Sequence, residues 1–182
     1  MTIEFIKFED SKDNYELMYK WCSKRYIYEW FEQRELSYEE IESKYKNKLN
    51  NSNQDLYIIK VDDIPIGYTQ IYKYDDKEYD IIKDKLVYEF DIFIGEEDYL
   101  SKGIGSKIID VLNDKIYKEY NADYIILRPF TRNTRAVKCY MKNGFKKIDE
   151  YVGKDTIGNK EDIVVLIHER GVKQLSFILN DE

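Results

Sequence analysis

A glycine-rich segment, Ser101-Lys102-Gly103-Ile104-Gly105-Ser106, lies between a predicted strand and the start of a long predicted helix. Glycines let backbone N–H groups approach a ligand closely, and a helix N-terminus carries partial positive charge, so the segment suits an anionic group such as phosphate. It fits neither a P-loop, because Ser106 precedes Lys107, nor a dinucleotide fingerprint, because Ile108 replaces the third glycine. A plain glycine turn into a helix is the alternative.

A second segment runs from Asn133 to Phe145 and reads Asn-Thr-Arg-Ala-Val-Lys-Cys-Tyr-Met-Lys-Asn-Gly-Phe. Asn133 is suited to cap a helix. On that helix Ala136 and Tyr140 lie one turn apart on the same face, and Gly144 is placed to end it. The Tyr140 hydroxyl is a candidate proton donor; a core aromatic is the alternative.

Asp91 interrupts an apolar strand, Phe90-Asp91-Ile92-Phe93-Ile94, shortly before the glycine-rich segment. A carboxylate in such a strand needs a partner, and a cationic amine is one. An ordinary aspartate, with a pKa of about 3.9, is a weak base towards an ammonium group. Asp91 is therefore a candidate to accept a proton from an amine or to orient the amine, with a structural salt bridge as the alternative.

The pattern of apolar residues predicts the elements that position these segments. Strands are expected over residues 3–8, 56–61, 64–72, 86–94, 124–127, 145–151 and 161–168, and helices over 12–25, 38–49, 103–120 and 135–143. Ser37 and Glu40 form a capping-box pattern at the second helix. The order predicts an α+β fold with a mixed, mostly antiparallel sheet and helices on both faces. Residues 1–170 are expected to form a single domain and residues 171–182 an accessory tail.

Composition excludes several classes of function. The 182 residues carry a net charge of −7, which argues against nucleic acid as a partner and is compatible with a cationic ligand. One histidine, His168, argues against a His-rich metal site, and Cys22 and Cys139 are too few for a disulfide scaffold. No apolar run spans a membrane and no signal pattern opens the chain. We expect a cytoplasmic protein without a metal, and a monomer rather than an obligate oligomer.

Together, the Gly-x-Gly helix start and the segment from Asn133 to Phe145 resemble the GNAT acetyltransferase superfamily. The resemblance implies acetyl-coenzyme A as cofactor, with its pantetheine between the strands that end near Ile94 and start near Tyr124. A backbone N–H near Phe93 would polarise the thioester carbonyl, and Tyr140 would assist the leaving thiolate. Leu100 stands where the family usually has Gln or Arg. The residues implied to bind the cofactor are Phe93, Ile94, Lys102, Gly103, Ile104, Gly105, Ser106, Asn133, Ala136 and Tyr140.

A closer resemblance is to the aminoglycoside 6′-N-acetyltransferases, including the acetylating half of bifunctional aminoglycoside-modifying enzymes. It is carried by residues 65–72, 91–96 and 99–105 and covers nearly the full length. It implies an antibiotic-resistance enzyme that acetylates a 6′-amine, with Asp91 as base, and Arg128 stands where that family usually has Asp. The residues assigned to the substrate are Tyr28, Trp30, Gln70, Tyr72, Asp91, Glu96, Glu97 and Asp162.

Each substrate assignment has a structural alternative. Tyr28 and Trp30 could belong to a core aromatic cluster, and Glu96 and Glu97 could be a solvated loop. Two other functions also remain: a GNAT enzyme that acetylates a protein N-terminus, a lysine or a polyamine, and a non-catalytic module that binds acyl-coenzyme A. Coenzyme A release with different amines would distinguish them.

Overall fold

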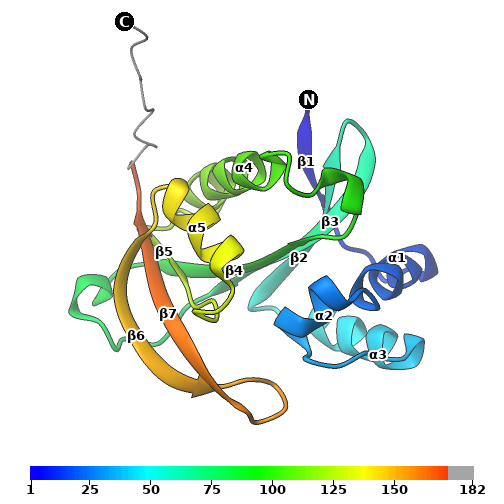
Figure 1. Cartoon of the computed structure of the whole chain (residues 1–182). Helices are drawn as coiled ribbons and strands as arrows, with labels where there is room; N and C mark the ends of the chain where they lie inside the picture. The colour runs from blue at the N-terminus through cyan, green and yellow to red at the C-terminus, as the bar shows by residue number, and fades with distance from the viewer. Residues whose placement is uncertain (172–182) are drawn as a thin grey trace, which may run out of the picture.

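The centre of the fold is a seven-stranded sheet in the order β1-β2-β3-β4-β5-β7-β6 (Figure 1). The computed structural model describes residues 1–171, so the expected tail from residue 172 onward lies outside the described part. The strands are β1 (Ile3–Lys7), β2 (Gln54–Val61), β3 (Ile64–Lys73), β4 (Val87–Ile94), β5 (Tyr124–Leu127), β6 (Lys146–Lys154) and β7 (Lys160–Glu169). Only the pairing of β4 with β5 is parallel among these strands, which confirms the expected mixed, mostly antiparallel sheet.

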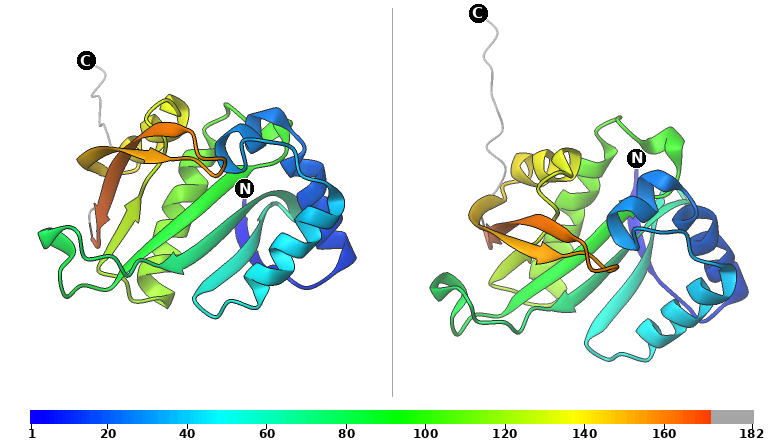
Figure 2. Two further views of the ribbon diagram at one scale, coloured as in Figure 1. Left: turned by 90° about the horizontal axis from the view of Figure 1, so that it is seen from below. Right: turned by 60° about the horizontal axis from the view of Figure 1, so that its bottom comes forward.

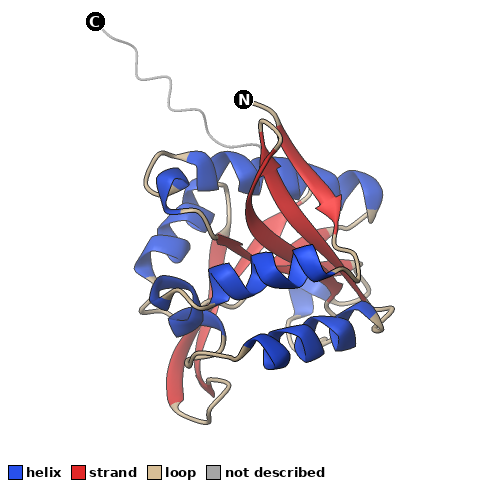
Figure 3. Ribbon diagram, turned by 90° about the vertical axis from the view of Figure 1, so that its right-hand side faces the viewer, coloured by secondary structure: helices blue, strands red, loops and turns tan. Residues whose placement is uncertain are grey.

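Helices cover both faces of the sheet, as expected. They are α1 (Lys12–Cys22), α2 (Arg25–Phe31), α3 (Tyr38–Leu49), α4 (Ile104–Glu119) and α5 (Thr134–Lys142). The first three pack against the face that carries Leu56, Ile58 and Tyr68 (Figure 3). Helix α4 packs against the opposite face, where Tyr57 and Ile71 lie. Because both faces are covered, β2 contains an unbroken buried run, Leu56–Ile59, rather than an alternating pattern.

Helix α2 was missed by the sequence prediction, which extended α1 to residue 25. No side chain caps α2 at Lys24, so its sequence carries no start signal. Tertiary contacts hold it instead: Lys24 Nζ and Tyr26 Oη each donate to the carbonyl of Gly95 at 2.8 Å. Phe31 packs edge-on against Phe93, with ring centroids 5.3 Å apart. Helix α2 therefore depends on the end of β4 for its position.

Strands β4 and β5 separate halfway along β4. Their parallel pairing runs from Val87↔Tyr124 to Glu89↔Ile126 and stops there. The edge of Phe90–Ile94 that faces β5 therefore has no strand partner, although β3 pairs with its other edge. At the far end of β4, a Cβ on Gly95 would lie 2.2 Å from the fully buried Trp21 indole. Glycine is required there because α1 approaches the strand end so closely.

Candidate active site

A cleft of about 830 Å³ opens where β4 and β5 separate. Its walls come from α2, α3, β3 and β4 on one side and from β5, α5 and the β6–β7 turn on the other. The tip of that turn reaches α2, where Thr156 N–H donates to Gln33 Oε1 at 3.0 Å (Figure 2). Eleven residues that the sequence proposed for the site line the cleft: Trp30, Gln70, Asp91, Phe93, Ile94, Gly103, Gly105, Ser106, Asn133, Ala136 and Tyr140.

The start of α4 forms one end of the cleft. Gly103 is the N-cap residue, with φ of 73°, and no side chain caps the helix. The N–H groups of the first turn have no helical partners and are available to an anion. A Cβ on Gly103 would meet no protein atom within 4 Å, so the space beside it is open. Asn133 caps α5 as predicted, accepting from the Ala136 N–H at 3.3 Å.

Basic residues of α5 extend this anion site. Arg135, Lys138 and Lys142 line the cleft. Their spacing carries no distinguishing sequence signal, because they are spread along one helix among apolar residues. Together with the open first turn of α4, they form a positively charged region suited to phosphate groups. Lys102 and Ile104 are not among the lining side chains, so any role of these two residues would rest on their backbone.

The two helices that bound this end are joined by a side-chain amide. Asn143 Nδ2 donates to the Ser106 carbonyl at 2.6 Å, and the Ser106 hydroxyl donates to Asn143 Oδ1. Asn143 follows α5 and is 1% exposed. It was missed because its position suggested only the end of a helix. This pair fixes the start of α4 against the end of α5, which keeps the anion site open.

Substitution of the glycines tests this site. We expect Gly103→Val and Gly105→Val to weaken acetyl-coenzyme A binding roughly 10- to 100-fold, the value of one or two hydrogen bonds to a charged group. Calorimetry measures the affinity. Gly158→Val is the matched control, because Gly158 also has positive φ and open space around it. Equal affinity for folded Gly103→Val and Gly158→Val would contradict the assignment.

Asp91 lies in the middle of the cleft wall and is held by the neighbouring strand. Its Oδ2 accepts from Gln70 Nε2 and, at 3.4 Å, from Tyr72 Oη. Gln70 and Asp91 are directly opposite each other on β3 and β4. Within residues 1–171, Oδ1 of Asp91 accepts no hydrogen bond. Asp91 therefore presents one restrained and one available oxygen.

Tyr140 lies on the opposite wall, on α5. Its side chain is 9% exposed and packs against Phe90 and Phe145, with ring centroids 6.1 and 5.8 Å away. Among the described residues its hydroxyl has no hydrogen-bond partner. Burial raises the pKa of the phenol, and the nearby Asp91 carboxylate raises it further. The phenol therefore stays protonated at neutral pH and is able to donate into the cleft.

The remaining acidic groups of the cleft all have partners within the chain, two of them cationic. Glu89 accepts from Arg128 at both oxygens, at 3.2 and 2.7 Å, and burial raises the pKa of Glu89 to about 7 against the opposing effect of Arg128. Glu32 pairs with Lys44. Asp155 accepts the N–H groups of Ile157 and Asn159, at 3.0 and 2.8 Å. Arg128 stands where the aminoglycoside 6′-N-acetyltransferases usually have Asp, and its positive charge is balanced by Glu89.

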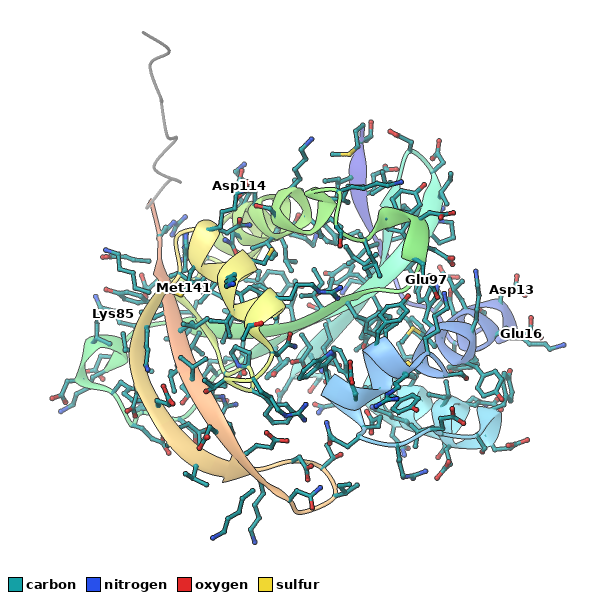
Figure 4. The ribbon with its side chains drawn as sticks, viewed as in Figure 1. Asp13, Glu16, Lys85, Glu97, Asp114 and Met141 are labelled. Atoms are coloured by element: carbon teal, nitrogen blue, oxygen red, sulfur yellow. The ribbon has the colours of Figure 1, made fainter. Side chains whose placement is uncertain are left out.

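Several residues predicted to contact substrate lie elsewhere. Tyr28, Tyr72, Glu96, Glu97 and Asp162 are absent from the cleft lining. Tyr72 touches the site only through Asp91. Glu96 accepts from Trp21 Nε1 at 2.8 Å and pairs with Lys20, while Glu97 is exposed towards α1 (Figure 4). Glu96 thus packs against α1, and neither Glu96 nor Glu97 lines the cleft.

Two lysines of α3 were missed. Lys44 and Lys48 line the cleft beside Asp91. Burial lowers the pKa of Lys44 to about 8 despite its ion pair with Glu32, and burial also lowers the pKa of Lys48. On the sequence they belong to a lysine-rich helix with no distinguishing pattern. Apart from the basic residues of α5, the cleft is thus lined by four basic and four acidic residues: Lys44, Lys48, Arg128, Lys154, Glu32, Glu89, Asp91 and Asp155.

Metal-binding clusters and membrane-spanning helices are both absent from the described residues. In residues 1–171, no group of three His, Cys, Asp or Glu side chains is placed to hold a metal ion. No helix of that part of the chain has both the length and the apolar character needed to cross a membrane.

Comparisons with known proteins agree with this geometry. Residues 10–152 match the acetyltransferase (GNAT) domain family. The aminoglycoside N(6′)-acetyltransferase type 1 proteins of Klebsiella pneumoniae and Serratia marcescens are each 26% identical over 137 residues, which covers 72% of this chain and 68% of each relative.

Solved structures share the fold. Aminoglycoside acetyltransferase AAC(6′)-Ib in complex with coenzyme A and kanamycin has a TM-score of 0.75 and 21% identity, over 93% of this chain and 95% of the other. Spermidine N-acetyltransferase from Vibrio cholerae, in complex with coenzyme A and spermine, has a TM-score of 0.74 and 18% identity, over 92% and 95%. The family match covers most of the chain and both glycine-rich and Asn133–Phe145 segments, so the protein belongs to the GNAT acetyltransferase family.

Proposed function

We propose that this chain transfers an acetyl group from acetyl-coenzyme A to the 6′-amine of aminoglycosides. The observation that carries the proposal is the free oxygen of Asp91. Of the four acidic residues in the cleft lining, Glu32 and Glu89 are ion-paired and Asp155 accepts backbone N–H groups, whereas Asp91 keeps Oδ1 without a hydrogen-bond partner in the described residues. A single ammonium group next to Oδ1 would complete the site. The 26% identity to aminoglycoside N(6′)-acetyltransferases supports this choice of acceptor.

As a GNAT enzyme the protein uses acetyl-coenzyme A, which supplies an activated thioester. The start of α4 and the basic face of α5 would bind its phosphates. The unpaired edge of residues 90–94 offers backbone N–H groups that would polarise the thioester carbonyl. Asp91 would orient the amine and accept its proton, and Tyr140, on the opposite wall, would donate a hydrogen bond to the leaving sulfur.

The balance of charges in the cleft limits how the acceptor is bound. Because the chain's own lysines and arginines offset the other carboxylates, we expect one ammonium group, at Asp91, to supply most of the electrostatic recognition. Polyamines resemble aminoglycosides only in their high positive charge, so we expect them to be poorer substrates than an aminoglycoside. The sugar hydroxyl groups would find their partners in the polar side chains of the cleft.

Product analysis tests the acceptor. Kanamycin, spermidine and a peptide are offered side by side, and coenzyme A release is measured. We expect kanamycin to be preferred and mass spectrometry with NMR to place the acetyl group on the 6′-amine. An aminoglycoside that carries a hydroxyl group in place of the 6′-amine should largely escape N-acetylation, because it has no amine for Asp91 to orient and deprotonate. Acetylation of another ring amine, or turnover of spermidine alone, would refute the proposal and leave the GNAT assignment intact.

A further inference from the structure

The side chain that restrains Asp91 is itself restrained. Gln70 is 8% exposed, and its Oε1 accepts two hydrogen bonds, from Lys48 Nζ at 2.6 Å and from Tyr68 Oη at 3.1 Å. Two donors at one amide oxygen determine which end of the amide faces which way. The Nε2 end is thereby directed at Asp91 Oδ2. The chain of contacts runs from α3, through β3, to β4.

Lys48 is an unusual residue to find in this chain of contacts. It lies in the last turn of α3, lines the cleft, and has no ion pair among the described residues. Burial lowers the pKa of its amine, and the Asp91 carboxylate opposes that shift. A half-buried cation without a carboxylate partner costs stability unless nearby groups satisfy it. Here it is satisfied by a neutral amide and, at longer range, by Asp91.

We propose that Lys48 is a positioning residue that acts through Gln70: it fixes the Gln70 amide so that Asp91 keeps Oδ2 restrained and turns Oδ1 towards the acceptor amine. The expected kinetic effects rest on the proposed amine acetylation, whereas the expected effect on the position of the Asp91 carboxylate rests on the geometry alone. Lys48 adds a second effect, because its positive charge near the bound ammonium group makes that group easier to deprotonate.

Other charged and titratable groups also face Asp91, and the pH dependence depends on all of them. They are Lys44, Tyr45 and Lys48 from α3, Tyr68 and Tyr72 from β3, Glu89 from β4 and Tyr140 from α5. Lys44 is already paired with Glu32, and Glu89 with Arg128. Lys48 is thus the cation of this group whose charge is not balanced by a paired carboxylate.

The test compares Lys48→Met with Lys48→Arg. Removing the positive charge stabilises the bound ammonium form, so the acidic limb of the kcat–pH profile should move to higher pH by about half to one unit in Lys48→Met. We expect kcat at neutral pH to fall roughly ten-fold, because the amide and the carboxylate lose their fixed orientation. KM should not rise, since the site becomes more negative. Lys48→Arg should restore the pH profile because it keeps a charge and a donor.

Controls separate this role from a structural one. Lys46→Met removes an exposed lysine from the same helix turn and should leave kcat and the pH profile unchanged. In a Gln70→Leu background, Lys48→Met should change the kcat measured on the plateau of the pH profile less than about two-fold, because the route to Asp91 is already broken, while the charge effect on the acidic limb remains. An equal loss in both backgrounds, or an unshifted pH limb in Lys48→Met, would overturn the proposal.

A crystal structure provides a readout that needs no substrate. In Lys48→Met the Asp91 carboxylate should be rotated or disordered, whereas Lys46→Met should keep both oxygens in place. An unchanged Asp91 in Lys48→Met would overturn the positioning role even if the enzyme is active. If the wild-type protein acetylates none of the amines offered, the proposed function fails, and the crystal comparison still decides the role of Lys48.

Discussion

Asp91→Asn is expected to lower kcat/KM for the acceptor amine by about 10²- to 10⁴-fold, the usual contribution of a positioned general base. The amide is isosteric with the carboxylate, but it accepts no proton and does not pair with an ammonium group. Because the chain's own cations engage or offset the other cleft carboxylates, both kcat and acceptor affinity should fall. Steady-state kinetics with kanamycin, together with calorimetry of acceptor binding, measures the two effects separately.

The control for this variant is Asp114→Asn on α4, where the carboxylate pairs with Lys118 at the surface (Figure 4). Its kinetics should match those of the wild type. Acetyl-coenzyme A affinity should be unchanged in both variants, because Asp91 lies away from the start of α4. If Asp91→Asn retains normal turnover, Asp91 is a structural residue and the base must be sought elsewhere.

Much of the fold was predictable because local patterns and tertiary structure agree. Helix α3 has exactly the predicted bounds, since its capping box of Ser37 and Glu40 is present as read from the sequence. The hairpin of β2 and β3 follows from two apolar runs separated by Asp62 and Asp63, both of which adopt positive φ. Helix α2 was missed because tertiary contacts, such as those with Gly95 and Phe93, hold it rather than a local sequence signal.

The candidate site was predictable where motifs determine backbone geometry. Gly103, Asn133 and Tyr140 lie where their segments suggested, because helix starts and ends carry recognisable sequence signals. The charge pattern was not predictable, because ion pairs such as Glu89 with Arg128 join residues 39 positions apart. Proximity in sequence suggested that Glu96 and Glu97 accompany Asp91, yet the chain turns at Gly95 and directs Glu96 to Trp21.

The division of the cleft into two electrostatic regions follows from the same packing. The basic residues of α5 face the start of α4, whereas the rest of the cleft has equal numbers of acidic and basic residues, two of each joined in ion pairs. In the proposed function, a cofactor with several phosphates would thus be directed to one end, and an amine to Asp91 at the other. The reaction would take place between the two ends of the cleft, beyond the point where β4 and β5 separate, with Tyr140 on the opposite wall.

Tyr140→Phe is expected to lower kcat by roughly 10- to 1,000-fold while changing acetyl-coenzyme A affinity much less. The phenol pKa is raised by burial and by Asp91, so complete proton transfer to a thiolate, with an ordinary pKa near ~8.5, is unfavourable. A hydrogen bond from the phenol in a site shielded from water is sufficient to stabilise the developing negative charge on sulfur. Rapid-mixing measurement of coenzyme A release reports this step directly.

The substitution should leave the fold intact, because the Tyr140 hydroxyl has no hydrogen-bond partner among residues 1–171 and the ring keeps its contacts with Phe90 and Phe145. The melting temperature should therefore stay close to that of the wild type. Tyr19→Phe removes an exposed hydroxyl from α1 and serves as the control for loss of a phenol. If Tyr140 stabilises the leaving thiolate, Tyr140→Phe should lose less activity with an acyl donor whose thiol is more acidic than with acetyl-coenzyme A. Equal losses for the two donors, or normal turnover, would assign Tyr140 to the packing of the core.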